Sequence, residues 1–567
     1  MIQQLRVDGV PTLLAPVTGP AHAGLAFRVG FADEPLYRRG ITHLIEHLAL
    51  HHVGVADYHY NGATGVEYTF FHMQGSAEEI ARFLTGVCAA LRDLPMHRLA
   101  VEKELLQAEA NGRSSGAADD MGLWRYGARN YGMPSYPEWG LSAVTPDDLR
   151  AWVARYFTRE NAVLWVAGDE IPAGLRLDLP GGVRQPPPAP SSALPVTPAF
   201  FPSMSGVLVW DTVVPRNAGA TVFAGVLERV MFRELRQEGG LSYTAQTNYE
   251  PLGADHATIT AVADSLPEKQ GAVLGAFVDV LAALRVGRID DTDVATVIKQ
   301  RVEGLRHAED QGGRLPGQAL NLLAGREVQS LDEVIAEISS VTVAQVAQVA
   351  AAACAAGLLM TPRASADWAG FTAAPSRSET VVAGTSYASL EGPDDHLVIG
   401  PEGVSLVRGD DIATVRFDAC AIVRAWPDGG RQFVGFDGIV VVVEPSLYAG
   451  AHGALPWLDA RVPPGLRVDH PPRDPSRIPQ PQMPAARPAP AGGKALGVVG
   501  LVVLIPVTLF FVGVAALLGL ALATDKSAVA GNDSVLAGFV VLIVILLTLA
   551  ATCGIGIHRS ARRVYRS

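Results

Sequence analysis

The pentapeptide His-Leu-Ile-Glu-His at positions 43 to 47 constrains this chain more than any other stretch, because its spacing places two imidazoles and a carboxylate on one side of a helix. His43 and His47 are four residues apart and can bind one metal ion, for which such donors favour Zn²⁺. Glu46 projects beside them as a candidate general base. The alternative is a partly buried helix whose histidines bond to carbonyl groups.

A third ligand is expected on a second helix, since a catalytic zinc commonly takes three protein ligands. Residues 95–112 predict that helix, because a proline opens the segment, an Asn-Gly pair ends it, and apolar residues recur at Leu99, Val101, Leu105 and Leu106. Glu102 and Glu109 are seven residues apart and share one face of it. Glu109 could coordinate the metal. Glu102 could orient one of the metal ligands without contacting the metal itself. Alternatively, both are solvated surface acids.

Three segments of the N-terminal region form one sequence pattern when taken in order. They are GITHLIEHLAL (40–50), NGATGVEYTFF (61–71) and VEKELLQAE (101–109). They resemble the N-terminal catalytic domain of the insulinase/pitrilysin family of zinc metallopeptidases, whose motif is an inverted form (HxxEH) of the thermolysin motif. The resemblance implies two related α/β domains, with the catalytic motif kept in the first.

The resemblance also implies site roles. His43, His47 and Glu109 would be the zinc ligands and Glu46 the base. The strand that begins at Asn61 and includes Ala63 would be an edge that pairs with extended substrate backbone. The chain departs from the family pattern in two places: Asn61-Gly62-Ala63 stands where an Asn-Ala pair is usual, and the span from His47 to Glu109 is shorter than the family norm.

A second family signature lies at residues 232–251, FRELRQEGGLSYTAQTNYEP. It resembles the family's second domain, in which an Arg and a Tyr seven residues apart help to hold the substrate near the zinc. Arg236 and Tyr243 have that spacing. The alternative is an ordinary helix-to-strand junction with a tyrosine in the core.

Proline-rich runs divide the chain into predicted domains. We expect an α+β architecture with a catalytic domain at 1–184, a linker at 185–198, a second, substrate-binding domain at 199–375 and a small antiparallel β domain at 376–470. A pleckstrin-homology-like barrel is one arrangement that fits the short alternating strands of the β domain. A second linker follows at 471–494.

Two apolar segments near the C-terminus, 495–523 and 535–557, contain no charged residue and are long enough to cross a bilayer. They predict a transmembrane hairpin followed by a basic tail at 558–567. Basic residues flank the hairpin on its outer ends, and the turn holds a single lysine. We therefore expect a multi-pass protein of the cell membrane whose large N-terminal region faces the cytoplasm. We expect no secretory signal, because the first residues lack a continuous apolar core of signal length.

Charge and cysteine content exclude several classes of function. A formal net charge of −12 argues against nucleic acid as a partner. The four cysteines are widely spaced, so neither a disulfide framework nor a cysteine-based zinc site is expected. The Ala-, Gly- and Arg-rich composition indicates a bacterial source.

Together these features predict a membrane-anchored zinc metalloendopeptidase that cuts peptides or short unfolded polypeptides through a zinc-activated water, with one Zn²⁺ per chain. Tyr243 or Arg236 would steady the substrate or the developing oxyanion. Family members enclose their substrates in a chamber of four such domains. The resemblance thus implies a homodimer or a heterodimer with a related subunit. The alternative function is a non-catalytic, membrane-tethered scaffold or partner subunit with the same fold.

Overall fold

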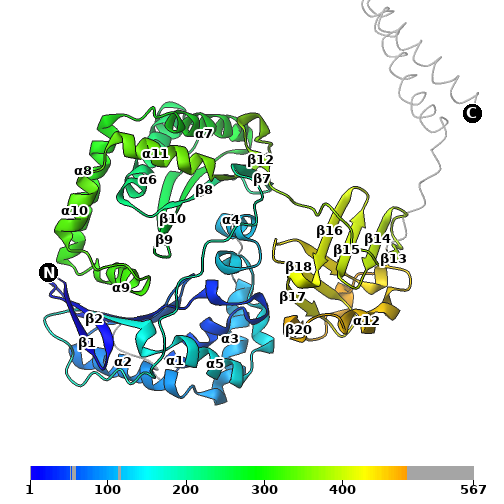
Figure 1. The fold of residues 1–567 in the computed structure, drawn as a ribbon, viewed down its shortest axis with the longest axis horizontal. Helices are drawn as coiled ribbons and strands as arrows, with labels where there is room; N and C mark the ends of the chain where they lie inside the picture. Colours follow the sequence, from blue (N-terminus) through cyan, green and yellow to red (C-terminus); the bar gives the residue numbers. More distant parts are fainter. Residues whose placement is uncertain (1, 52, 54–58, 113–115, 482–567) are drawn as a thin grey trace, which may run out of the picture. The chain divides into compact units, whose positions relative to one another are not determined.

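A computed structural model of the chain describes residues 2–51, 53, 59–112 and 116–481 (Figure 1). Residues Met1–Ser389 and Pro393–Gln480 form one compact unit, and that unit is described below. The predicted membrane hairpin and basic tail lie outside the described residues. Among the described residues, no single helix is long and apolar enough for a membrane span. The helices α10 (Leu331–Ser339) and α11 (Val343–Ala355) meet that test only when joined across an 85° bend.

The first half of the unit is a six-stranded sheet covered by helices. Its strand order is β1-β2-β6-β3-β5-β4, and only the β2–β6 pair is parallel. The strands are β1 (Gln3–Val7), β2 (Val10–Ala15), β3 (His22–Phe27), β4 (Tyr60–Thr64), β5 (Thr69–Gln74) and β6 (Ala162–Ala167). The helices are α1 (Ile41–Leu50), α2 (Ala77–Arg92), α3 (Leu99–Gly112), α4 (Ala117–Tyr126) and α5 (Pro146–Tyr156).

Local sequence explains these helices. Ser76 caps α2 by accepting a hydrogen bond from the backbone of Glu79, and Thr145 and Asp148 cap α5 reciprocally. The apolar faces of α1, α2 and α5 bury one shared core on the sheet, which includes Leu44, Ile45, Leu84 and Leu149. The helix predicted at 95–112 is an α-helix only from Leu99, and its apolar face is narrower than expected: Val101 and Leu105 are exposed, whereas Leu106 is buried.

The second half is a six-stranded sheet in the order β12-β7-β11-β8-β10-β9, and its last five strands repeat the order of β2-β6-β3-β5-β4. Its edge strand β12 pairs with β7 in parallel, whereas β1 pairs with β2 antiparallel. Its strands are β7 (Ala199–Ser203), β8 (Val207–Pro215), β9 (Ala245–Leu252), β10 (His256–Asp264), β11 (Leu358–Pro362) and β12 (Thr372–Ala373). Its helices are α6 (Ala218–Met231), continued by a π-helical turn (Phe232–Glu238), α7 (Gln270–Arg285), α8 (Asp291–Asp310), α9 (Leu315–Leu323), α10 (Leu331–Ser339) and α11 (Val343–Ala355). As in the first half, the early strand β7 pairs in parallel with the late strand β11.

The two halves share buried contacts. Leu315, Ala319 and Leu323 of α9 pack on the first sheet, on the face opposite to α1 and α2. The buried carboxylate of Asp211 on β8 accepts a hydrogen bond from Arg125 Nε of α4 at 2.8 Å. A buried ion pair and an apolar seam therefore join the halves.

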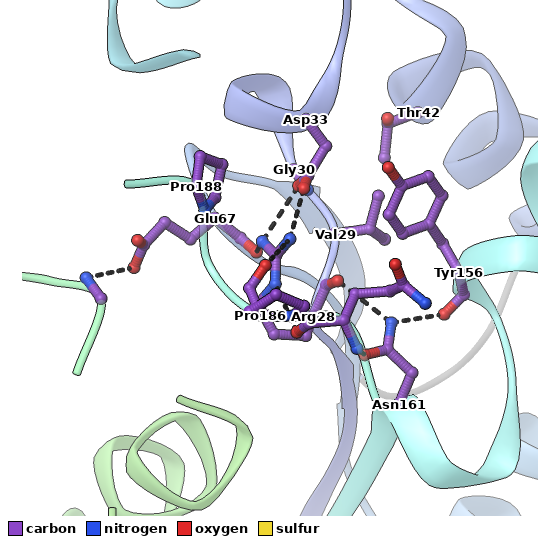
Figure 2. Close-up of polar contacts among 12 residues, drawn as sticks. Arg28, Val29, Gly30, Asp33, Thr42, Glu67, Tyr156, Asn161, Pro186 and Pro188 are labelled. Carbon is purple, nitrogen blue, oxygen red and sulfur yellow. Dashed lines mark hydrogen bonds and ion pairs between the residues drawn. The ribbon is translucent and has the colours of Figure 1, made fainter. Parts of the chain in front are cut away.

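The proline-rich segment between the halves is docked by a buried arginine (Figure 2). Arg28, which directly follows β3, donates to the carbonyl oxygens of Gln185 at 3.3 Å and Pro186 at 3.1 Å, and it pairs with Asp33. Proline has no backbone N–H, so its carbonyl oxygen is the group that can hold it in place. Glu67 continues this network into the second half by accepting the backbone N–H of Gly253 at 3.1 Å.

The third part of the unit is a β domain built from two four-stranded sheets. Their orders are β13-β14-β15-β16 and β19-β18-β17-β20, and β17–β20 is the one parallel pair in them, where we expected antiparallel pairing throughout. The elements are β13 (Thr385–Ala388), β14 (Asp395–Ile399), β15 (Gly403–Arg408), β16 (Asp411–Arg416), β17 (Cys420–Ala425), β18 (Arg431–Gly435), β19 (Val440–Val443), α12 (Leu455–Asp459) and β20 (Arg467–Asp469). Both sheets and α12 share one core.

Candidate metal centre

Helix α1 is anchored at its N-terminus by a buried carboxylate. Glu34 accepts the backbone N–H groups of Gly40 at 3.0 Å and Thr42 at 2.9 Å, and so takes the place of a capping side chain. Arg39 balances its charge at 2.9 Å. Leu44, Ile45 and Leu48 of the helix are buried in the core. This anchoring directs the opposite side of α1, which carries both histidines, toward α3.

The structure brings together the three predicted metal ligands. Glu109 of α3 places one carboxylate oxygen 4.0 Å from His43 Nε2 and the other 3.8 Å from His47 Nε2. One ligand atom from each residue lies within 4.8 Å of the other two. The alternative in which the histidines of α1 only cap carbonyls does not describe this arrangement, because both Nε2 atoms face a carboxylate.

Each histidine has a second carboxylate on its other ring nitrogen. His43 Nδ1 lies 2.9 Å from Glu138 Oε1, and His47 Nδ1 lies 3.4 Å from Glu102 Oε2. An ionised carboxylate can only accept a hydrogen bond, so in a neutral imidazole Nδ1 carries the hydrogen and Nε2 keeps its lone pair. Both rings are therefore oriented to offer Nε2 to a metal.

Glu102 was predicted for this role, whereas Glu138 was not. Glu102 is buried and is held by Arg98 at 3.0 Å, so it is no solvated surface acid. Glu138 follows a proline in an irregular segment between two 3₁₀ helices, and it shares no helical or strand periodicity with α1. No signal in the sequence identified it, because only packing brings it to His43.

Glu46 lies beside the ligands and is buried. The Thr64 hydroxyl of β4 donates to Glu46 Oε2 at 2.8 Å. Burial raises the pKa of Glu46, while the charges of His43 and His47 and the Thr64 hydrogen bond oppose this effect. A carboxylate with a raised pKa is a stronger base than an exposed glutamate.

The departure at Gly62 has a physical reason. A Cβ atom at this position of β4 would lie 2.9 Å from both Glu46 Oε1 and Leu50 Cδ1. The absence of a side chain therefore lets the backbone of β4 approach the Glu46 carboxylate closely.

The donor set fits a zinc ion. Ligand atoms on a tetrahedral zinc are about 3.4 Å apart, so the two separations of 3.8 and 4.0 Å need only a small inward movement. The surrounding charge also favours a cation. Burial opposes protonation of His43, yet the Glu138 hydrogen bond and the charges of Glu138, Glu46 and Glu109 outweigh it and raise the pKa of His43.

The predicted substrate strand lies at the edge of the first sheet. Among the described residues β4 pairs with β5 alone, with Asn61 opposite His72 and Ala63 opposite Phe70. Asn61 is exposed and Ala63 is half-buried. An edge strand carries backbone groups that an added strand can pair with.

Arg236 and Tyr243 lie together but apart from the metal ligands. The Arg236 guanidinium carbon is 4.6 Å from the centroid of the Tyr243 ring, which is a cation–π contact. Tyr243 is 75% exposed, so the alternative of a core tyrosine is wrong. In the part of the chain that the structure describes, no hydrogen bond, ion pair or ring contact joins this pair to the metal ligands or Glu46.

No protein-family model matches the chain, and no curated protein matches it either. Solved structures do match. A protease from Helicobacter pylori aligns with a TM-score of 0.55 at 16% identity, over 64% of this chain and 99% of that one. A peptidase M16 inactive domain from Pseudomonas fluorescens aligns with a TM-score of 0.53 at 16% identity, over 64% and 98% of the two chains.

The first half of the periplasmic protease PqqL from Escherichia coli aligns with a TM-score of 0.51 at 13% identity, over 65% of this chain and 93% of that one. This chain therefore has the mixed α/β fold of M16-like peptidases, which is the insulinase/pitrilysin fold that the resemblance implied. At such low identity the likeness extends to the fold alone.

Proposed function

We propose that this chain is a membrane-anchored zinc metalloendopeptidase that hydrolyses peptides or short unfolded polypeptides. One observation carries the proposal: the convergence of two imidazole nitrogens from α1 with the Glu109 carboxylate from α3, beside the buried Glu46. Three ligands and an adjacent carboxylate are the parts that hydrolysis at a metal requires.

His43, His47 and Glu109 would hold the zinc ion. When bound, zinc acts as a Lewis acid that polarises the scissile carbonyl and makes water at the site more acidic. Glu102 and Glu138 keep the two rings in the tautomer and orientation that such binding needs.

Glu46 would carry the proton. Its carboxylate accepts the proton of the attacking water and returns it to the leaving amine. Thr64 holds one of its oxygens, which restricts the rotation of the side chain. Burial excludes competing water, and it raises the pKa of Glu46 in the direction that a base requires.

Substrate would bind as an extended strand along β4, with its backbone paired to Asn61 and Ala63. Such pairing needs an unfolded segment, which is why peptides and unfolded polypeptides are the proposed substrates. Arg236 and Tyr243 would hold the substrate or the developing oxyanion. Since neither contacts the metal ligands of its own chain in the described residues, we assign their site to a second subunit, in a homodimer or a related heterodimer.

The proposed location is a bacterial cell membrane, with the peptidase halves in the cytoplasm. The apolar segments 495–523 and 535–557 and the basic residues that flank them support this topology. The net charge of −12 supports a partner other than nucleic acid.

A non-catalytic scaffold is the second candidate, because a similar fold occurs in the inactive domain from Pseudomonas fluorescens. Glu46→Gln separates the two functions. We expect the full-length chain to bind one zinc and to cut unfolded peptides in a mass-spectrometric digest. The Glu46→Gln variant should keep its zinc and lose a factor of about 10²–10⁴ in kcat. Zinc-free protein in both forms would support the scaffold instead.

A further inference from the structure

The segment from Gly127 to Ala143 forms one wall of the candidate metal centre. It carries Glu138, whose carboxylate holds His43 Nδ1 at 2.9 Å. The same segment lines a cavity of about 130 Å³ beside His43 and Glu109, through Pro134, Ser135, Tyr136 and Pro137. The position of this wall thus sets the orientation of one predicted ligand.

The wall has little regular structure of its own. It contains two short 3₁₀ helices, Asn130–Ser135 and Trp139–Ala143, and Glu138 directly precedes the second. Short 3₁₀ turns have poorer hydrogen-bond geometry than an α-helix. A segment of this kind depends on packing from outside to hold a fixed conformation.

The β domain provides that packing. Ala421 and Ile422 of β17, Val434 of β18 and Val468 of β20 form one buried cluster with Leu36, Ala128, Met133 and Tyr136 of the first half. The N–H of Ala128 donates to the carbonyl oxygen of Phe436 at 3.0 Å. Gly127 has a φ of +66°, and a Cβ there would lie 2.1 Å from that same oxygen. The two backbones therefore meet without an intervening side chain.

One contact of the β domain reaches the residue next to Glu138. The Arg424 guanidinium carbon lies 4.3 Å from the centroid of the Trp139 ring. Arg424 also donates to Gln432 and to His470, and among the described residues no carboxylate is within ion-pair distance of it. Burial lowers the pKa of Arg424 to about 10. The guanidinium carbon also lies 4.9 Å from the centroid of the Trp426 ring. This cation is thus held between two aromatic rings and neutral groups.

We propose that the β domain is a positioning element of the metal centre: Arg424 on Trp139, together with the apolar seam at Ile422, holds Glu138 against His43. The inference rests on the proposed function only in taking His43 as a metal ligand. It gives the 376–470 region, for which the sequence indicated no ligand, a role in zinc affinity that does not require a separate partner.

A double-mutant cycle on the full-length chain tests this coupling, with zinc itself as the probe and a competing chelator to measure affinity. We expect Glu138→Gln to weaken zinc binding by about 10–100-fold, as loss of a carboxylate behind a histidine ligand commonly does. Arg424→Ala should weaken it by about 3–10-fold, a part of that loss. Arg424→Lys should restore most of the affinity, because a lysine keeps a cation on the ring.

If the effects of the two substitutions on zinc affinity are non-additive, Arg424 acts through Glu138. In the Glu138→Gln background, Arg424→Ala should have almost no further effect on zinc affinity. Arg461→Ala is the matched control, since Arg461 lies 3.4 Å from the Trp457 ring in the same domain. It should leave zinc affinity unchanged. Trp457 lies on α12, and neither residue belongs to the seam with the wall.

Three results would overturn the proposal: no zinc binding by the wild type, wild-type affinity in Arg424→Ala, or an equal loss from Arg424→Ala with and without Glu138. Hydrolysis is not measured in this cycle. A chain that binds zinc and shows the coupling but cuts no peptide would therefore contradict the proposed peptidase function and leave the positioning role intact.

Discussion

The two α/β halves share the order of five of their six strands, yet they use equivalent helix pairs for different purposes. In the first half α1 follows β3 and packs on α3, and in the second half α6 follows β8 and packs on α8. The first pair presents two histidines and Glu109 to one another. The second presents Gly225 to Val297, while Arg229 and Arg233 pair with the buried Asp293.

The same helix contact can thus be built with or without metal-ligating side chains. One helix pair is closed by a glycine contact and an ion pair, whereas the other leaves room for donor atoms separated by about 4 Å. Function in such a fold depends on the side chains placed at the helix contact and cannot be inferred from the fold.

The largest expected effect is loss of zinc from the first helix pair alone. His47→Ala removes one of three ligands, so zinc affinity should fall by more than about 100-fold, and hydrolysis should fall to background. Metal analysis after dialysis measures this. Arg229→Ala on α6 is the control and should bind zinc as the wild type does. Equal zinc content in His47→Ala and the wild type would contradict the ligand assignment.

Crowding the second helix pair should change stability but not zinc binding. A Cβ in Gly225→Ala would lie 2.6 Å from Val297 Cγ1, so the substitution overpacks the contact between α6 and α8. We expect a loss of about 1–3 kcal/mol in the free energy of unfolding. Urea denaturation gives this value, and the double substitution with Val297→Ala should recover part of it. A fully stable Gly225→Ala protein would show that the helices separate freely.

Adding a side chain at Gly62 in the first half should instead change catalysis and leave stability unchanged. A Cβ in Gly62→Ala would lie 2.9 Å from Glu46 Oε1 and from Leu50 Cδ1, and it would displace the carboxylate whose other oxygen Thr64 holds. We expect a decrease in kcat of up to about 10-fold, with zinc affinity and the unfolding midpoint unchanged. Steady-state kinetics with parallel zinc titration separates these quantities. A change in zinc affinity without a change in kcat would show that Gly62 does not act on Glu46.

The smallest expected effect concerns the junction between the halves. Burial raises the pKa of Glu67, against its hydrogen bonds from Tyr131 and Gly253 and the charge of Arg28. The folded state therefore binds a proton that the unfolded state has released above the ordinary value of 4.5. From that pH up to the raised pKa, this group makes stability decline as pH increases.

Glu67→Gln should flatten this decline, because glutamine does not titrate and its oxygen can still accept a hydrogen bond. The thermal unfolding midpoint measured between pH 4 and 8 tests the change. If the stability of the wild type rises steadily across this window, in step with the variant, the pKa of Glu67 is not raised in the folded state.

Sequence alone was sufficient where the determinant is local. The period of a helix places His43, Glu46 and His47 on one side, and it places Glu102 and Glu109 on one face of α3, because residues three, four and seven apart are neighbours on any α-helix. The alternation of buried residues along β10 is local in the same way, because it is a property of consecutive positions.

Tertiary structure alone decided the contacts between distant segments. Glu138 reaches His43 across 95 positions of sequence, Arg424 reaches Trp139 from another domain, and Gly62 makes room for Glu46 only because β4 packs on α1. No period links such positions. Their distances are set by how the helices and sheets pack, and that depends on buried surface summed over the whole chain.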